Sequence, residues 1–180
     1  MKIGIISDTH GGLMDFSRAV EYLSECEKII HLGDVLNHGP RNGLPPYYDP
    51  KTIAAGLSKT NKFIYIQGNC DSEVDEMVTG KNIHEKERLI EVDGFRIYAV
   101  HGHKGSEEER IKKAKELKAD ILLYGHTHIK KLEKIDGVLV CNPGSTTFPK
   151  DGSKSIAFYE DGVLNLVDLE QNEIIISEEL

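Results

Sequence analysis

The chain has 180 residues, of which 39% are hydrophobic, and these values predict one domain over residues 1–180 with a substantial core. The formal net charge of -8 argues against a nucleic acid polymer as partner, because backbone binding requires clustered Lys and Arg. Cys26, Cys70 and Cys141 are widely spaced, which predicts neither a disulfide framework nor a structural zinc knuckle. The apolar run at Met1–Ile6 is too short for a signal peptide or a membrane span, so we expect a cytoplasmic protein without membrane association.

The first half of the chain alternates short apolar runs with amphipathic segments, a pattern that predicts strands separated by helices. Right-handed crossovers would make the three expected strands parallel neighbours in one sheet. The expected strands are Lys2–Ile6, Lys28–Leu32 and Phe63–Ile66, with one helix carrying Leu13, Phe16, Val20 and Leu23 and another beginning at Asp49-Pro50.

The second half is rich in Asp-Gly pairs between apolar runs, which predict β-hairpins. Ser106 and Glu109 have capping-box spacing and predict a helix to about Leu117, and the alternating charges of Glu107–Lys118 indicate a solvated face without a functional role. The predicted fold class is α/β, with two packed mixed β-sheets flanked by helices. The hairpins pair Arg88–Val92 with Phe95–Val100, Lys131–Ile135 with Val138–Cys141, and Ser155–Tyr159 with Val163–Asp168.

Five polar clusters directly follow apolar, strand-like runs. In α/β sheets, sites form at the carboxyl ends of strands, so we expect the clusters to converge on one crevice. Each cluster alone has an ordinary explanation, such as a helix cap for an aspartate or a turn for Asn69, but five in one short chain favour a shared function. The clusters are Asp8-Thr9-His10, Gly33-Asp34, Gly68-Asn69-Cys70-Asp71, His101-Gly102-His103 and Gly125-His126-Thr127-His128.

Imidazole nitrogens and carboxylate oxygens together suit Mn, Fe, Zn and similar ions, and the absence of a cysteine pair argues against a closed structural zinc site. Two ions can share a carboxylate and activate a bridging water. They can also hold the attacking oxygen and the leaving oxygen of an in-line displacement at phosphorus. Asp34 is the candidate for the shared carboxylate. Asn69 would add a neutral oxygen ligand, which keeps the centre positive enough to receive a phosphate anion.

These motifs resemble the calcineurin-like metallophosphoesterase superfamily, which has Asp-x-His, Gly-Asp, Gly-Asn-His-Asp, a histidine-glycine strand end and Gly-His-x-His in this order. The Leu32–Asn42 and Gly68–Glu73 segments look like the YfcE-type bacterial phosphodiesterases, and Asn142–Ser145 also resembles the superfamily. The resemblance implies a four-layer sandwich and hydrolysis of phosphodiesters, with manganese expected and iron, zinc, nickel or cobalt as alternatives. It also implies that Asp8, His10 and His128 bind one ion, Asn69, His101 and His126 bind the other, and Asp34 bridges them.

One departure concerns the residue after the motif asparagine, where the superfamily commonly has a histidine that protonates the leaving group and this chain has Cys70. A thiol with an ordinary pKa of about 8.5 is a poorer acid at neutral pH than an imidazole. We therefore expect diesters, or esters with acidic leaving groups, to be preferred over alkyl monoesters. His38 or His103 would be the alternative acid.

The expected catalytic residues are Asp34, Asn69 and His103, and the expected substrate contacts are His38, Arg41 and Cys70, with the planar guanidinium of Arg41 suited to phosphate oxygens. The expected partner is a small phosphoester, and a homo-oligomer is left open. Two alternatives remain at this point. One is a phosphomonoesterase, and the other is a protein-binding scaffold with a vestigial site, like the retromer subunit that has this fold.

Overall fold

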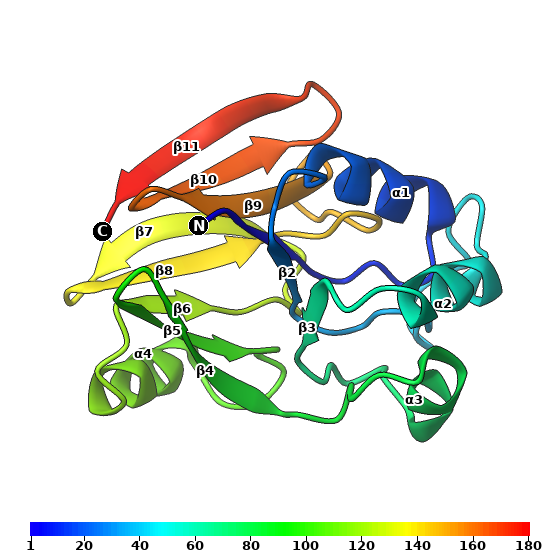
Figure 1. Cartoon of the computed structure of the whole chain (residues 1–180), viewed down its shortest axis with the longest axis horizontal. Coiled ribbons are helices and arrows are strands. Elements are labelled where there is room, and N and C mark those ends of the chain that lie inside the picture. The colour runs from blue at the N-terminus through cyan, green and yellow to red at the C-terminus, as the bar shows by residue number, and fades with distance from the viewer.

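The computed structural model describes all of residues 1–180 and contains two β-sheets that face each other (Figure 1). The first sheet contains β1 (Ile3–Ile6), β2 (Lys28–His31), β3 (Phe63–Tyr65), β9 (Ser155–Glu160), β10 (Val163–Asp168) and β11 (Glu173–Glu179), in the order β11-β10-β9-β1-β2-β3. The second contains β4 (Glu87–Val92), β5 (Phe95–Val100), β6 (Ile121–Leu123), β7 (Lys130–Ile135) and β8 (Val138–Pro143), in the order β4-β5-β6-β8-β7.

Both sheets are mixed, and the predicted parallel arrangement of the first three strands is confirmed. β1 pairs with β2 and β2 with β3 in parallel, whereas β9 runs antiparallel to β1. Each of the three predicted hairpins is present, and its Asp-Gly turn has positive φ at both residues, as a type I′ turn requires.

Four helices complete the fold: α1 (Leu13–Tyr22), α2 (Pro50–Ser58), α3 (Glu73–Thr79) and α4 (Glu107–Glu116). α1 and α2 cover the outer face of the first sheet through Phe16, Ala19, Ile53 and Leu57, which belong to one buried cluster with Ile6 and Ile29. α4 covers the second sheet through Ile111 and Ala114. The predicted four-layer sandwich is therefore confirmed.

Alternating side chains of β1 show how the layers are built. Ile3 and Ile5 belong to the core between the sheets, together with Ile97 and Leu123 of the second sheet. Ile6 points to the opposite side and packs in the cluster under α1 and α2. Because both faces of β1 are covered, its end is held rigidly, and the residues that follow it start from a fixed position.

Two elements have no counterpart in the sequence prediction. α3 begins at a capping box of Ser72 and Asp75 but lacks a broad apolar stripe, and its Met77 is 80% exposed. β11 is an edge strand in which Ile174–Ile176 are all exposed, so it lacks the alternation expected of a half-buried strand. None of the helices has the length and apolar character required to cross a membrane.

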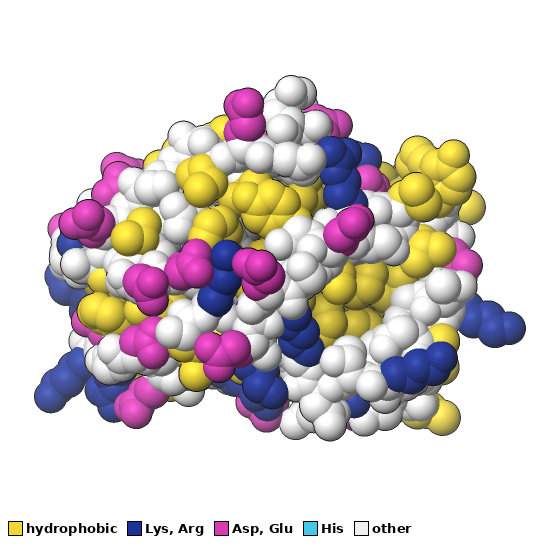
Figure 2. Space-filling model, turned by 45° about the horizontal axis from the view of Figure 1, so that its top comes forward, with side chains coloured by type: hydrophobic (Ala, Val, Ile, Leu, Met, Phe, Trp, Pro, Cys, Tyr) yellow, Lys and Arg dark blue, Asp and Glu magenta, His cyan; other side chains and the backbone are white.

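The surface carries mixed charges and scattered apolar patches. Figure 2 shows acidic and basic side chains interspersed on one face, with hydrophobic groups exposed between them and no histidine in view. The histidine-rich clusters therefore do not open onto this face.

Candidate metal centre

The polar clusters meet where strands of both sheets end. Asp8 and His10 follow β1, Asp34 follows β2 and Asn69 follows β3, while His101 follows β5 and His126 and His128 follow β6. β1, β2 and β3 are parallel, as are β5 and β6, so their carboxyl ends lie at one edge of each sheet. The structure thus brings together side chains separated by up to 120 positions in the sequence.

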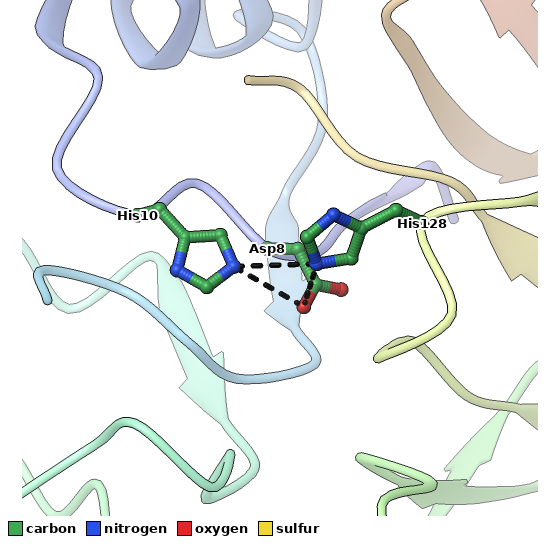
Figure 3. A group of neighbouring side chains, drawn as sticks. All are labelled: Asp8, His10 and His128. Atoms are coloured by element: carbon green, nitrogen blue, oxygen red, sulfur yellow. Dashed lines mark hydrogen bonds and ion pairs between the residues drawn. The ribbon is translucent and has the colours of Figure 1, made fainter. Parts of the chain in front are cut away.

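The first donor group consists of Asp8, His10 and His128 (Figure 3). Nε2 of His128 lies 3.1 Å from Oδ1 of Asp8 and 3.3 Å from Nε2 of His10. Nε2 of His10 lies 3.7 Å from the same carboxylate oxygen. All three side chains are buried and point toward one another, Asp8 and His10 from the loop after β1 and His128 from the loop after β6.

The second group is formed by Asp34, His101, Asn69 and His126. Nε2 of His101 lies 3.5 Å from Oδ2 of Asp34 and 3.2 Å from Oδ1 of Asn69. The ring centroid of His126 is 5.2 Å from that of His101. Oδ2 of Asp34 is also 3.8 Å from Nε2 of His10, so this carboxylate lies between the two groups.

Hydrogen bonds to backbone carbonyls fix the orientation of three imidazoles. Nδ1 of His10 lies 2.8 Å from the Asn37 carbonyl, and Nδ1 of His128 lies 2.8 Å from the Phe148 carbonyl. His101 makes the same contact with the Leu32 carbonyl at 2.6 Å. A carbonyl oxygen only accepts, so each Nδ1 carries the hydrogen and donates it, and each Nε2 is directed to the centre as metal-binding histidines require.

This donor set fits divalent cations. With hydrogen on both Nδ1 atoms, neutral His10 and His128 present lone pairs at Nε2 to each other and to the carboxylate of Asp8. Acceptors at such short separations repel one another unless a proton or a cation lies between them. Nitrogen and carboxylate donors without a cysteine pair suit manganese, iron, zinc and similar ions.

Unusual backbone conformations are concentrated at these residues. Five of the seven expected ligands, namely Asp8, His10, Asp34, His126 and His128, have positive φ although none is glycine. Such conformations are uncommon for residues with a Cβ and persist only where the surrounding structure holds them. This is a second observation, independent of the side-chain distances, that marks the cluster as a functional site.

The two aspartates create a field that favours positive charge at the centre. Burial opposes ionisation of Asp8, but its close contacts with the imidazoles of His10 and His128 outweigh it and hold the pKa of Asp8 well below its ordinary value. Burial likewise opposes the charged form of His101, yet the bond to Asp34 and the charge of Asp8 raise its pKa to about 9. The same field would attract a metal ion, whose binding would displace protons from these imidazoles.

A polar cavity of about 540 Å³ opens over this centre and is called here the arginine cavity, because Arg41 lines it. His10, Asp34, Asn69, His126 and His128 reach its wall, together with Cys70, Asn42 and Lys150. Arg41 and Cys70, two of the three expected substrate contacts, therefore lie on the wall of this cavity. His38 does not line the cavity, since it packs edge-on against Tyr48 at 5.3 Å between ring centroids.

His103 is exposed and lies beside the centre, with its ring centroid 5.4 Å from His101 and 6.1 Å from His126. It lines a second cavity, and it does not reach the arginine cavity. Burial and the neighbouring His101 lower its pKa.

Several residues that position the ligands were not predicted. The buried carboxylate of Asp71 accepts from the amides of Asp34, Val35 and Gly68 at 2.7 to 2.9 Å, which ties the loops after β2 and β3 together. Burial raises the pKa of Asp71 to about 6 despite these three donors. Ser145 donates to the Asp8 carbonyl at 2.7 Å. The only sequence signal for these roles was their place inside the Gly68–Asp71 and Asn142–Ser145 motifs.

His31 is another buried residue behind the centre, and its hydrogen bonds define its tautomer. The Gly33 amide donates to its Nδ1 at 3.1 Å. Thr9 donates its hydroxyl hydrogen to the Val35 carbonyl, so at the 3.0 Å contact with His31 it is the acceptor and Nε2 is the donor. Neutral His31 therefore links the loops after β1 and β2.

Comparison with known proteins decides the family. Residues 1–161 match the family model described as the calcineurin-like phosphoesterase superfamily domain. The chain belongs to the calcineurin-like phosphoesterase superfamily. This membership confirms the resemblance inferred from the motifs.

Relatives in this superfamily match over nearly the whole chain. The phosphodiesterase YfcE of Escherichia coli K12 is 36% identical over 179 residues, which cover 97% of this chain and 96% of YfcE. A solved structure of YfcE from E. coli, described as a phosphoesterase, has a TM-score of 0.89 at 34% identity and covers 99% of both chains. The phosphodiesterase MJ0936 of Methanocaldococcus jannaschii is 30% identical over 184 residues, or 98% of this chain and 99% of that protein.

The fold is also similar to that of vacuolar protein sorting 29. The structure from Cryptosporidium parvum has a TM-score of 0.71 at 20% identity and covers 99% of this chain and 97% of that chain. At this identity the similarity concerns the fold alone.

Proposed function

We propose that this protein is a phosphodiesterase that uses two divalent metal ions, with manganese the expected metal. The observation that carries the proposal is the position of the Asp34 carboxylate, within 3.8 Å of Nε2 of His10 and 3.5 Å of Nε2 of His101. A carboxylate between two donor groups suits a bridging ligand. The names of YfcE and MJ0936 as phosphodiesterases support the same substrate class.

In this proposal Asp8, His10 and His128 hold one ion, Asn69, His101 and His126 hold the other, and Asp34 bridges them. When bound, two such ions would lower the pKa of a shared water for in-line attack and would neutralise the phosphate oxygens. Two carboxylates against two divalent cations leave the centre with a net positive charge, because Asn69 and the histidines contribute none.

Residues of the arginine cavity would receive the substrate. Arg41 and Lys150 are exposed on its wall and supply positive charge for non-bridging phosphate oxygens. Cys70 is half-buried, and burial together with the Asp34 charge raises its pKa to about 12, so its thiol is a weak proton donor at neutral pH. This favours diesters with acidic leaving groups over alkyl monoesters.

Metal analysis combined with hydrolysis of bis(p-nitrophenyl) phosphate tests this proposal. We expect about two ions of manganese per chain after reconstitution, turnover of the diester, and slower turnover of p-nitrophenyl phosphate. Loss of activity on chelation and its return with Mn²⁺ are expected as well. Stoichiometric metal without turnover of any ester would instead favour a binding scaffold, and a preference for the monoester would favour a phosphomonoesterase.

A further inference from the structure

A second cavity of about 640 Å³ lies on the other side of Asn69 from the arginine cavity. Asn69 lines both cavities, so they meet at one of the proposed metal ligands. The second one is lined by Lys86, Lys104, Lys113, Arg110 and His103, among others, and is called here the lysine cavity. It includes part of α4, whose charged run was predicted to be a solvated face without a functional role.

Four cationic and three acidic side chains line the lysine cavity, and its lysines have no acidic partner within ion-pair distance. Lys86, Lys104 and Lys113 form no ion pair. Its three acidic residues form hydrogen bonds with neutral groups and do not pair with these lysines, so the side chains that line the cavity carry one net positive charge. Glu87 accepts from the Tyr98 hydroxyl at 2.7 Å, Glu109 caps α4 at the Ser106 amide, and Asp71 accepts from three backbone amides.

Arg110 gives this cavity a rigid wall. Its Nη1 lies 3.1 to 3.3 Å from the carbonyl oxygens of Gly102, Lys104 and Gly105, and its guanidinium stacks over Tyr124 at 4.7 Å. Its Nε is buried and has no hydrogen-bond partner. The loop that carries His103 and Lys104 is therefore held in place before any substrate arrives.

A phosphodiester has two ester arms that leave phosphorus in different directions. With phosphorus at the metal centre, one arm would extend into the arginine cavity and the other past Asn69 into the lysine cavity. Tyr98 and Val100 are the only hydrophobic residues that line the lysine cavity, so it suits a polar, anionic group rather than a lipid or aryl group. Its volume is sufficient for a nucleotide-sized group.

We propose that the lysine cavity binds the second ester arm and selects phosphodiesters in which this arm carries a further anionic group, such as a terminal phosphate. This inference rests on the proposed function. It narrows the substrate class from phosphodiesters in general to diesters with an additional negative charge on one side. His103, at the entrance from the metal centre, would contact the same arm.

Two dinucleotides that differ by one terminal phosphate, ApA and pApA, test the inference with the Mn²⁺-loaded protein. We expect the KM for pApA to be about tenfold lower than that for ApA. The double variant Lys104→Glu/Lys113→Glu should raise the KM for pApA about tenfold, so that the KM values of the variant for pApA and ApA differ by less than about twofold. The preference for pApA should also weaken as salt is added.

Lys112→Glu/Lys115→Glu is the matched control, because it makes the same change in net charge and alters α4 residues outside the lysine cavity. It should retain the preference for pApA. Equal KM values for the two substrates in the parent, or equal effects of the two double variants, would overturn the inference.

A binding measurement separates this inference from the proposed function. Calorimetric titration of the metal-stripped protein should give tighter binding of pApA than of ApA, and Lys104→Glu/Lys113→Glu should abolish the difference. If the loaded protein turned over neither dinucleotide nor any other diester, the proposed function would fail, and this titration would still decide whether the cavity binds the extra phosphate. Equal affinity for pApA and ApA would refute the lysine cavity as an anion site.

Discussion

Oδ2 of Asp34 lies 3.5 Å from Nε2 of His101, and the same oxygen lies 3.8 Å from Nε2 of His10 in the group formed with Asp8. The other oxygen of Asp34 accepts from the Cys70 amide at 2.8 Å. One oxygen thus anchors the side chain while the second remains directed at the histidines. This division of roles suits a bridging carboxylate, and it makes Asp34 the most informative residue to change.

Asp34→Asn should abolish diester hydrolysis, with a loss of at least about 100-fold, because the bridging charge is removed while the size and the bond to the Cys70 amide are retained. Far-UV circular dichroism should match that of the parent. Steady-state kinetics with bis(p-nitrophenyl) phosphate and metal content measure the effect. Activity within about twofold of the parent would exclude Asp34 as the bridging ligand.

Cys70→His should raise monoester hydrolysis at least about tenfold, because an imidazole at this position would supply a proton donor with a pKa nearer neutrality. Cys70 lines the arginine cavity beside the centre, so the new group would face the substrate. Cys70→Ala is the control, since it removes the thiol without adding an acid. Unchanged turnover of p-nitrophenyl phosphate by Cys70→His would refute the argument about the leaving group.

Gly68→Ala should disturb the centre through the Asp34 backbone. A Cβ at position 68 would collide with the amide nitrogen and carboxylate of Asp34, and neither can move without breaking its bonds to Asp71 or Cys70. We expect a stability loss of about 1–3 kcal/mol and a fall in kcat/KM of at least about tenfold.

Gly43→Ala is the matched control for Gly68→Ala, because nothing lies within 4 Å of a Cβ at that position. Its kinetics and its urea midpoint should equal those of the parent. Equal behaviour of the two variants would mean that the close approach of Gly68 to Asp34 does not constrain the centre.

The free energy of unfolding should decrease as the pH falls below about 6.5, because the fold keeps His31 neutral. Burial lowers the pKa of His31 from 6.5 to about 3, so the folded state keeps it neutral while the unfolded chain takes up a proton. This contribution is fully present above the unfolded pKa and is lost progressively below it. Protonation would also disrupt the bond from the Gly33 amide to Nδ1.

Urea unfolding of the metal-stripped parent and of His31→Gln measures this effect. Between about pH 7.5 and about pH 5.5 the parent should lose about 1.4 kcal/mol more than the variant. The comparison of two pH values cancels any constant loss of stability caused by the substitution. Identical pH dependence in both proteins would show that His31 is not held neutral by the fold.

The sequence predicted those parts of the fold that have a strong local signal. Ile3–Ile6 is apolar throughout because both faces of β1 are buried, and Asp93-Gly94 marks a hairpin because both residues adopt positive φ. β11 escaped prediction because it is an edge strand whose consecutive isoleucines face solvent. α3 was not predicted, although its capping residues can be recognised in the sequence, because its apolar residues do not form a buried stripe.

The expected ligands were named from the sequence because several clusters of His, Asp and Asn rarely occur together in one short chain, and because each cluster directly follows a predicted strand. Their arrangement depends on residues with no such signal. The three amides that bind Asp71 come from two loops, and the tautomer of His31 depends on a chain of bonds through Thr9. The lysine cavity could not be predicted from the sequence, because Lys86, Lys104 and Lys113 line one cavity only when β4 pairs with β5 and α4 packs on the second sheet.

Anomalous diffraction from crystals grown with Mn²⁺ would locate the metal ions and their ligands. We expect two manganese peaks about 3.5–4 Å apart, with Asp34 between them, Asp8, His10 and His128 on one ion, and Asn69, His101 and His126 on the other. A single peak, or peaks held by other residues, would contradict it.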